Sequence, residues 1–244
     1  MPLLEVRGVT KKFGALTALG GVDITVQDNS FHGLIGPNGS GKSTLLKAIA
    51  GAHFPDSGSI VLAGKNITKM VPSDRSRRGL SFKFQITAVL PELSVYDNVL
   101  LAMQAHKPIW SLLRSRSRQA LHDEIASTLD RFQLADRAND LASELSHGQQ
   151  QWLEIAMALT QKPRLLLLDE PTGGMSPEER RATGELLIPI KQFCSMVIVE
   201  HDLDFIKDIC DRLTVLDNGR VLDDGSIKEI EASSKVQEVY TTRV

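Results

Sequence analysis

The nine residues from Gly36 to Thr44 read Gly-Pro-Asn-Gly-Ser-Gly-Lys-Ser-Thr and fit G-x-x-x-x-G-K-[ST], the pattern of a phosphate-binding loop. They follow Phe31–Ile35, a short apolar run that predicts a strand, and the sequence from Lys42 onward predicts a helix. Glycines let backbone N–H groups turn inward around phosphates, and the positive end of the following helix faces the same point. The alternative is a glycine turn that only caps a helix.

This loop predicts a nucleotide with Mg²⁺ as its ligand. We expect Lys42 to reach the β and γ phosphates and Ser43 to place its hydroxyl on the metal ion. The residues expected to hold the nucleotide here are Gly36, Asn38, Gly39, Ser40, Gly41, Lys42, Ser43 and Thr44.

A second apolar run, Leu165–Leu168, ends at two adjacent carboxylates, Asp169 and Glu170. A continuous apolar run of this kind predicts a central strand, and open parallel sheets bind ligands at the carboxyl ends of their strands. We expect Asp169 to hold Mg²⁺, directly or through water, and Glu170 to act as general base on the attacking water. A strand ending in Asp-Glu can also cap the next helix, but the upstream loop favours the chemical role.

The rest of the chain alternates strand-like and helix-like segments, which predicts a parallel sheet covered on both faces. Residues 86–160 differ, because Val95–Ala105 and Ser115–Phe132 have helical spacing and predict a helical lobe inserted into the sheet domain. Further strands are predicted at Leu3–Val9, Gly21–Val26, Gly58–Leu62, Leu80–Phe84 and Met196–Val199.

Composition limits the classes of protein that fit. The 244 residues are 42% hydrophobic with a net charge of -2, which disfavours disorder and a nucleic-acid partner. The short basic runs Arg75–Arg78 and Arg114–Arg118 are expected to be solvated surface. Cys194 and Cys210 are expected to be buried free thiols in a reducing compartment. The N-terminus does not resemble a signal peptide, and no stretch approaches the ~20 apolar residues that a membrane-spanning helix needs.

The segment Leu145–Gln151, which reads Leu-Ser-His-Gly-Gln-Gln-Gln, resembles the signature motif of ABC transporter ATPases, usually written LSGGQ. Ser146 could simply cap the helix that follows. The resemblance implies that Ser146, Gly148 and Gln149 contact the γ phosphate of a nucleotide bound by an opposite protomer. His147 departs from the usual glycine; we expect it to be tolerated bulk, with hydrogen bonding near the nucleotide as the alternative.

Other sequence motifs that resemble those of the ABC family occur in the expected order along the chain. Phe13 resembles the aromatic residue that stacks on adenine, although an isolated aromatic is as often core. Gln85 matches the Q-loop glutamine, which in the family touches Mg²⁺ or water and relays the nucleotide state. Gly173–Pro177 occupies the position of the D-loop, and His201 matches the switch histidine that contacts the γ phosphate. Glu170, His201 and Gln85 are therefore the expected catalytic residues, and Ser43, Gln85 and Asp169 the expected metal ligands.

The resemblance implies an α/β fold of the P-loop NTPase class with a mainly parallel central sheet, an N-terminal antiparallel β portion and an inserted helical subdomain. Residues 1–244 would form one ABC nucleotide-binding domain. Residues 1–85 and 161–244 would form its core, and residues 86–160 its helical signature subdomain.

The family also implies partners. Two such domains would sandwich two ATP molecules with Mg²⁺, each between the phosphate-binding loop of one protomer and the signature of the other. The second ATPase would be a paralogue, with a homodimer as the alternative. Two transmembrane permease subunits and an external substrate-binding protein would complete an importer, with this chain peripheral on the cytoplasmic face of the inner membrane.

The cargo is predicted from finer similarities. Leu145–Gly148 followed by Gln151–Ile155 resembles the urea-importing ATPases, so import of urea or a related small amide is the expectation. The Gly-Gly-Met-Ser-Pro D-loop resembles the ATPases of branched-chain amino acid importers and of their urea-importing relatives alike. Import of branched-chain amino acids is the first alternative, and a soluble ABC ATPase is the second. A P-loop kinase or GTPase would not explain the signature segment.

Overall fold

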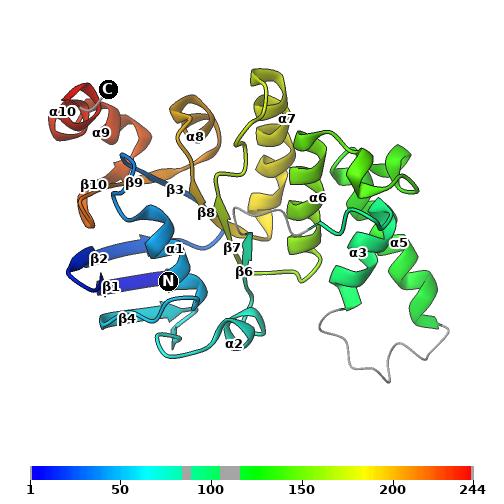
Figure 1. The fold of residues 1–244 in the computed structure, drawn as a ribbon, viewed down its shortest axis with the longest axis horizontal. Helices are drawn as coiled ribbons and strands as arrows, with labels where there is room; N and C mark the ends of the chain where they lie inside the picture. Colours follow the sequence, from blue (N-terminus) through cyan, green and yellow to red (C-terminus); the bar gives the residue numbers. More distant parts are fainter. Residues whose placement is uncertain (1, 84–88, 105–115, 243–244) are drawn as a thin grey trace.

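The computed structural model describes residues 2–83, 89–104 and 116–242 (Figure 1). A six-stranded sheet with the order β10-β9-β3-β8-β7-β6 runs through the centre. Its first five strands in chain order are parallel, and only β10 runs antiparallel to its neighbour. The strands are β3 (Phe31–Ile35), β6 (Leu80–Lys83), β7 (Leu165–Asp169), β8 (Ser195–Val199), β9 (Arg212–Asp217) and β10 (Arg220–Ser226). The predicted mainly parallel sheet is confirmed.

A second, antiparallel sheet has the order β2-β1-β4-β5, as the predicted N-terminal β portion requires. Its strands are β1 (Leu4–Phe13), β2 (Leu16–Val26), β4 (Ser57–Leu62) and β5 (Lys65–Asn66). The first two are longer than the sequence pattern predicts, because the β1–β2 pairing continues through register shifts between Val6 and Thr10. Gly8 and Gly21, with φ of 55° and 93°, lie in this irregular stretch and break the alternation from which strands are predicted.

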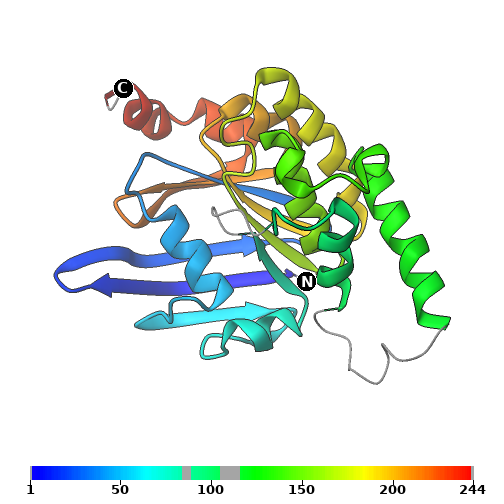
Figure 2. The ribbon, with the colours of Figure 1, turned by 45° about the vertical axis from the view of Figure 1, so that its right-hand side comes forward.

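Helix α1 (Lys42–Ala50) lies between the two sheets, as Figures 1 and 2 show. Leu45, Leu46 and Ile49 pack in one buried cluster with side chains from the antiparallel sheet and with Leu165 and Leu167 of β7. This packing fixes the helix that begins at the phosphate-binding loop against both sheets. The short helix α2 (Pro72–Ser76) precedes β6.

The opposite face of the central sheet is covered by helices. Val99, Ile125 and Ile155 belong to the same buried cluster as Leu166 and Ile198 of the sheet, so the predicted helical lobe shares its core with the sheet. The helices on this side and at the C-terminus are α3 (Val95–Gln104), α5 (Arg116–Arg131), α6 (His147–Leu159), α7 (Pro177–Leu187), α8 (Leu203–Ile209), α9 (Ile227–Ala232) and α10 (Ser234–Thr242). Single 3₁₀ turns occur at Ala135–Arg137, Ala142–Glu144 and Ile188–Gln192.

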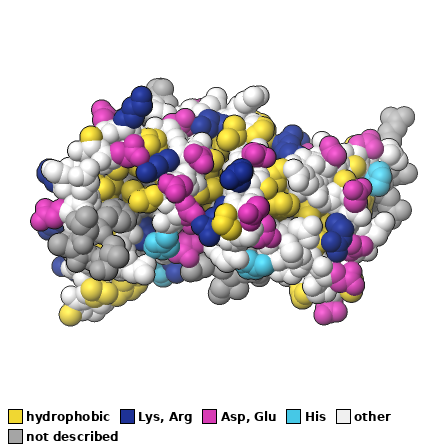
Figure 3. Space-filling view, turned by 90° about the horizontal axis from the view of Figure 1, so that it is seen from above, with side chains coloured by type: hydrophobic (Ala, Val, Ile, Leu, Met, Phe, Trp, Pro, Cys, Tyr) yellow, Lys and Arg dark blue, Asp and Glu magenta, His cyan; other side chains and the backbone are white. Residues whose placement is uncertain are grey.

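The predictions made from composition can be compared with the burial of the cysteines and the distribution of charge. Cys194 and Cys210 are buried free thiols, and burial raises the pKa of Cys194 to about 12. On the face seen in Figure 3, described acidic and basic side chains are interspersed, in line with the small net charge. None of the helices in the described residues is both long enough and apolar enough to cross a membrane.

The prediction of a solvated Arg75–Arg78 run is wrong for Arg75, which is 0% exposed. Its guanidinium donates to four backbone carbonyl oxygens, two of them from the last turn of α1. The side chains of Arg114–Arg118 lie outside the described residues.

Candidate nucleotide-binding and hydrolysis site

The phosphate-binding loop joins β3 to α1 in a conformation that only glycine tolerates at two points. Gly36 has φ 145°, and a Cβ there would lie 2.1 Å from the Leu216 carbonyl oxygen. Gly41 has φ 106°, and a Cβ there would lie 2.7 Å from the Ala18 carbonyl oxygen. The loop is therefore wedged between β2 and β9, and its first and last glycines are required by packing as well as by conformation.

Lys42 begins α1 and points back into the loop. Its Nζ donates to the carbonyl oxygens of Gly36 at 2.7 Å and Pro37 at 3.0 Å. Burial lowers the pKa of Lys42, while Glu170 and Asp169 act in the opposite direction. Lys42 is buried, and its ammonium makes its hydrogen bonds to neutral carbonyl oxygens, so it is placed to pair with an anion. Nearby, the buried Ser40 Oγ has no hydrogen-bond partner within the described residues, as expected of a hydroxyl that awaits a polar ligand.

The expected metal ligands Ser43 and Asp169 meet at the start of α1. Ser43 Oγ donates to Asp169 Oδ1 at 3.4 Å, and Asp169 is 2% exposed. Burial raises the pKa of Asp169, the hydrogen bond from Ser43 opposes that shift, and Glu170 adds to it. One hydroxyl and one carboxylate suit Mg²⁺, which prefers oxygen ligands and takes the remainder from phosphates and water. Across the described ranges, no three His, Cys, Asp or Glu side chains gather into a protein-only metal cage.

Glu170 and His201 follow the neighbouring parallel strands β7 and β8, and the sheet brings them together. His201 Nε2 lies 2.9 Å from Glu170 Oε1. The backbone of Glu170 has φ 51°, a left-handed conformation that is rare for a non-glycine residue, and its N–H donates to the Val199 carbonyl oxygen. This turn aims the carboxylate toward the phosphate-binding loop instead of along the strand.

A cavity of about 390 Å³ collects most of the predicted site. Phe13 lies at its rim, 44% exposed, with its ring edge against His53 at a centroid distance of 5.3 Å. An exposed aromatic at the rim fits a stacking surface better than a core residue. Predicted residues that line the cavity are Phe13, Asn38, Gly39, Ser40, Gly41, Lys42, Ser43, Thr44, Glu170 and His201. Gly36 and Asp169 are not among the lining residues, and Gln85 lies outside the described residues.

Ser146, Gly148 and Gln149 do not line this cavity. They form the start of α6, where Ser146 Oγ accepts from the Gln149 N–H at 3.2 Å and Gln149 Oε1 accepts from the Ser146 N–H at 3.0 Å. The predicted capping role of Ser146 is thus present in the structure; Ser146 is exposed, whereas Gly148 is buried.

Sequence reasoning missed several parts of the site. Asn218 lines the cavity, and the Gly219 N–H donates to the Ser40 carbonyl oxygen at 2.9 Å; the Asn-Gly pair between two strands was the available turn signal. Glu200 is buried, and its Oε1 accepts from both the N–H and the hydroxyl of Thr172 at 2.7 Å. Glu200 thereby fastens the loop after Glu170 to the end of β8.

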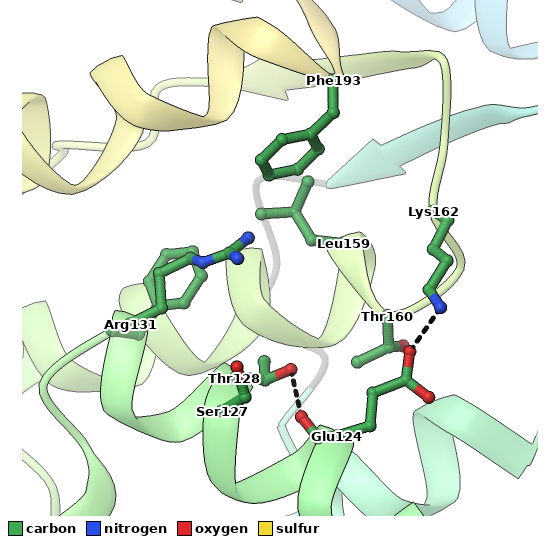
Figure 4. Close-up of a pocket in the computed structure, with 9 residues that line it drawn as sticks. Glu124, Ser127, Thr128, Arg131, Leu159, Thr160, Lys162 and Phe193 are labelled. Carbon is green, nitrogen blue, oxygen red and sulfur yellow. Dashed lines mark hydrogen bonds and ion pairs between the residues drawn. The ribbon is translucent and has the colours of Figure 1, made fainter.

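A second cavity, of about 420 Å³, lies at the other end of α6 (Figure 4). The Arg131 guanidinium lies 5.1 Å from the centre of the Phe193 ring, and Lys162 pairs with Glu124 at 2.6 Å. This cavity lacks a glycine loop and the predicted carboxylates, so its size does not make it the nucleotide site.

Comparisons with known proteins agree with this geometry. The family model described as "ABC transporter" matches residues 19–173. The high-affinity branched-chain amino acid transport ATP-binding protein BraF of Pseudomonas aeruginosa is 32% identical, over 98% of this chain and 97% of its own. The ribose import ATP-binding protein RbsA of Burkholderia mallei is 34% identical over 99% of this chain, which spans only 47% of that relative.

Solved structures give the same result. The ADP conformation of MJ1267, an ATP-binding cassette of an ABC transporter, superimposes with a TM-score of 0.88 at 30% identity and covers 99% of both chains. The dimeric post-hydrolysis state of the cassette MJ0796, bound to ADP and Pi, matches with a TM-score of 0.78 at 26% identity, over 92% of this chain and 98% of that one.

Proposed function

The chain belongs to the ABC transporter family as an ATP-hydrolysing ATP-binding domain, and from that premise we propose that it drives import of branched-chain amino acids through partner permeases. The observation that carries the cargo is the near full-length match in both directions to BraF, the branched-chain amino acid relative. The ribose relative is about as similar in sequence but is roughly twice as long as the matched region, so it supports import without supporting ribose.

Import of urea or a related small amide is the second candidate. It is favoured by the segments Leu145–Gly148 and Gln151–Ile155, which resemble the urea-importing ATPases. The relatives described above do not include a urea importer, so we place the urea reading, which the sequence alone favours, behind the amino acid reading.

The site residues take the following roles in this proposal. The amides of the glycine loop and Lys42 bind the β and γ phosphates of ATP, and Phe13 stacks on adenine. Ser43, Asp169 and Gln85 would hold Mg²⁺, which would neutralise phosphate charge when bound. Glu170 Oε accepts a proton from the attacking water, and His201 keeps that carboxylate oriented and reaches the γ phosphate.

Each chain supplies half of two sites. This arrangement is supported by the position of the α6 start, because Ser146, Gly148 and Gln149 do not line the cavity that holds the phosphate-binding loop. The ADP- and Pi-bound dimer of a similar cassette supports it too. We propose a paralogous ATPase as the second chain, with a second copy of this one as the alternative.

The proposal includes a place in a larger assembly. Residues 86–160 act as a helical subdomain that moves against the core when ATP joins the two chains, and Gln85 relays that motion. Two permeases and an external binding protein complete the importer, and the chain sits peripherally at the cytoplasmic face of the membrane.

The test is uptake of labelled leucine and labelled urea in cells that depend on this chain, carrying the native protein, Glu170→Gln or the control Glu185→Gln. Glu185 is an exposed acidic residue of α7, so its variant is expected to transport normally. If Glu170→Gln loses leucine uptake but keeps urea uptake, the result supports import of branched-chain amino acids. Loss of urea uptake alone moves the protein to the urea branch, and retention of both rejects import of either cargo.

A further inference from the structure

We propose that His147 is a positioning residue that ties the start of α6 to the loop carrying Glu170 in the same chain; the inference rests on the proposed two-chain ATPase. His147 Nε2 lies 3.0 Å from the carbonyl oxygen of Gly173. Because a carbonyl only accepts, Nε2 carries the proton and donates it. His147 therefore makes a specific contact beyond the expected tolerated bulk, and the alternative of hydrogen bonding near the nucleotide stays a prediction.

Close packing on two neighbouring segments holds the start of α6 in place beside the Gly173 loop. Gly174 has φ 76°, and a Cβ there would lie 3.3 Å from the His147 ring, so the imidazole packs closely on the loop backbone. On the other side, a Cβ on Gly148 would lie 2.7 Å from Glu179 Oε1. Glu179 also accepts from the Ser176 N–H at 2.9 Å and so caps α7. The start of α6 is thus seated against both the loop and the first turn of α7.

The loop leads directly back to the catalytic carboxylate. The Gly173 N–H donates to the Glu170 carbonyl oxygen at 3.2 Å, which closes a turn between the two residues. Glu170 holds its left-handed backbone at the start of that turn, and its side chain meets His201. A shift of the Gly173 peptide would therefore rotate the Glu170 backbone and misdirect its carboxylate.

This geometry assigns His147 a role in coupling the binding of ATP at the partner chain to hydrolysis by Glu170 of its own chain. In the proposed dimer the start of α6 faces ATP held by the partner, while Glu170 acts on ATP held by its own chain. His147 lies in the first turn of α6, and its side chain bonds to the loop that follows Glu170. Engagement of the partner's nucleotide is then transmitted to the chain's own Glu170 over a single hydrogen bond and one turn.

Two variants separate the hydrogen bond from helix stability. His147→Gln keeps an N–H donor at a similar reach, whereas His147→Ala removes the donor but has the highest helix propensity. We expect His147→Ala to speed hydrogen exchange at the amides of residues 173–175 and to lower kcat for ATP about five- to tenfold, with KM changed by less than about twofold. His147→Gln should restore both. His122→Ala, at an exposed histidine of α5, is the control and should change neither.

Dimers of two differently tagged chains, one of them Glu170→Gln, show where His147 acts. Only the chain with native Glu170 can turn over its ATP, so His147→Ala should reduce turnover when placed on that chain and not on the other. Loss only in the opposite arrangement, or unchanged exchange at residues 173–175 in His147→Ala, overturns the proposal. If the native chain hydrolyses no ATP either as a dimer of two copies or together with its paralogous ATPase, the proposed function fails, and the exchange measurement still decides the contact itself.

Discussion

Arg75 shows how much of this site depends on a side chain far from the nucleotide. Its guanidinium donates to the carbonyl oxygens of Ala48 at 2.7 Å and Ile49 at 2.6 Å, in the last turn of α1. The same group donates to Met70 and Thr68, and burial lowers the pKa of Arg75 to about 10. A buried cation thus satisfies the C-terminal end of the helix whose N-terminal end faces the phosphates.

Replacing Arg75 by Met should lower the free energy of unfolding by about 3–5 kcal/mol, because four carbonyl oxygens, in two buried and two part-buried contacts, lose the guanidinium donor. Urea denaturation measures the change. Arg77→Met is the matched control, since the Arg77 side chain is 73% exposed and its pairing with Asp74 at 3.4 Å is superficial. Equal stability of Arg75→Met and the native chain would contradict the account.

The sequence predicts the positions of some functional side chains but not of others. Lys42, Ser43, Asp169 and Glu170 follow from local patterns, because a loop or strand end alone fixes where such residues lie. Arg75 could not be recognised, since its burial depends on packing of α2 against α1, and its neighbours in sequence are solvated. The same holds for His147, whose partner Gly173 lies 26 residues further on.

Pairs of elements are joined by buried charges that no local pattern reveals. Lys83 at the end of β6 pairs with Glu154 of α6 at 3.1 Å, with side-chain exposures of 4% and 3%, and it also donates to Gln151. This pair connects the strand that leads to Gln85 with the helix that begins at the signature. It fixes the register between the two elements at the junction of the sheet and the helical lobe.

Glu154→Leu should lower the free energy of unfolding by about 3–5 kcal/mol, because it leaves the Lys83 ammonium buried without its carboxylate. The double variant Lys83→Leu with Glu154→Leu should recover most of that loss. Urea denaturation of the native chain, the two single variants and the double variant measures it. Breaking the exposed pair Lys162–Glu124 should cost less than about 1 kcal/mol. A double variant no more stable than Glu154→Leu would refute this reading.

A second buried group links β3 to β9. His32 is 2% exposed, and its Nε2 lies 2.7 Å from Thr214 Oγ1, which in turn bonds to Asp224. Burial lowers the pKa of His32 to about 4, although the Asp224 carboxylate opposes this and Arg212 adds to it. Because the folded-state pKa lies below the unfolded value, the neutral imidazole stabilises the fold at neutral pH. That contribution is lost as the pH falls from about 6.5 to about 4.

The size of the effect is roughly 3 kcal/mol, from about 1.4 kcal/mol for each unit between the two pKa values. Removing the titrating group in His32→Gln should therefore cost stability at pH 7.5 and much less at pH 4.5, as urea midpoints at the two pH values will show. A stability difference between the two chains that is the same at both pH values would count against the assignment.

Elements were predictable where their pattern is local and regular. Phe31–Ile35 is both predicted and observed as a strand, and the observed α3 and α5 fall within the predicted helices Val95–Ala105 and Ser115–Phe132, of which Ala105 and Ser115 lie outside the described residues. The extensions of β1 and β2 were not predictable, because bulges at Gly8 and Gly21 interrupt the alternation of side chains. The Asn218 turn is local, but its position beside Ser40 is decided by sheet order.

For the molecule as a whole, the decisive feature is that one edge of the sheet gathers the phosphate-binding loop, Asp169, Glu170 and His201, while the signature residues lie apart. Parallel strands place their carboxyl ends at one edge, so the first group follows from strand order. The second group does not line the cavity, and the proposed second chain gives it a role there.

The central claim is that Glu170 activates the water that attacks ATP, and it is tested most directly by the rate of ATP hydrolysis in Glu170→Gln beside native protein and Glu185→Gln. The account predicts that Glu170→Gln binds ATP with Mg²⁺ but hydrolyses it at least about a hundredfold more slowly, while Glu185→Gln matches the native rate. Hydrolysis by Glu170→Gln at the native rate would contradict it.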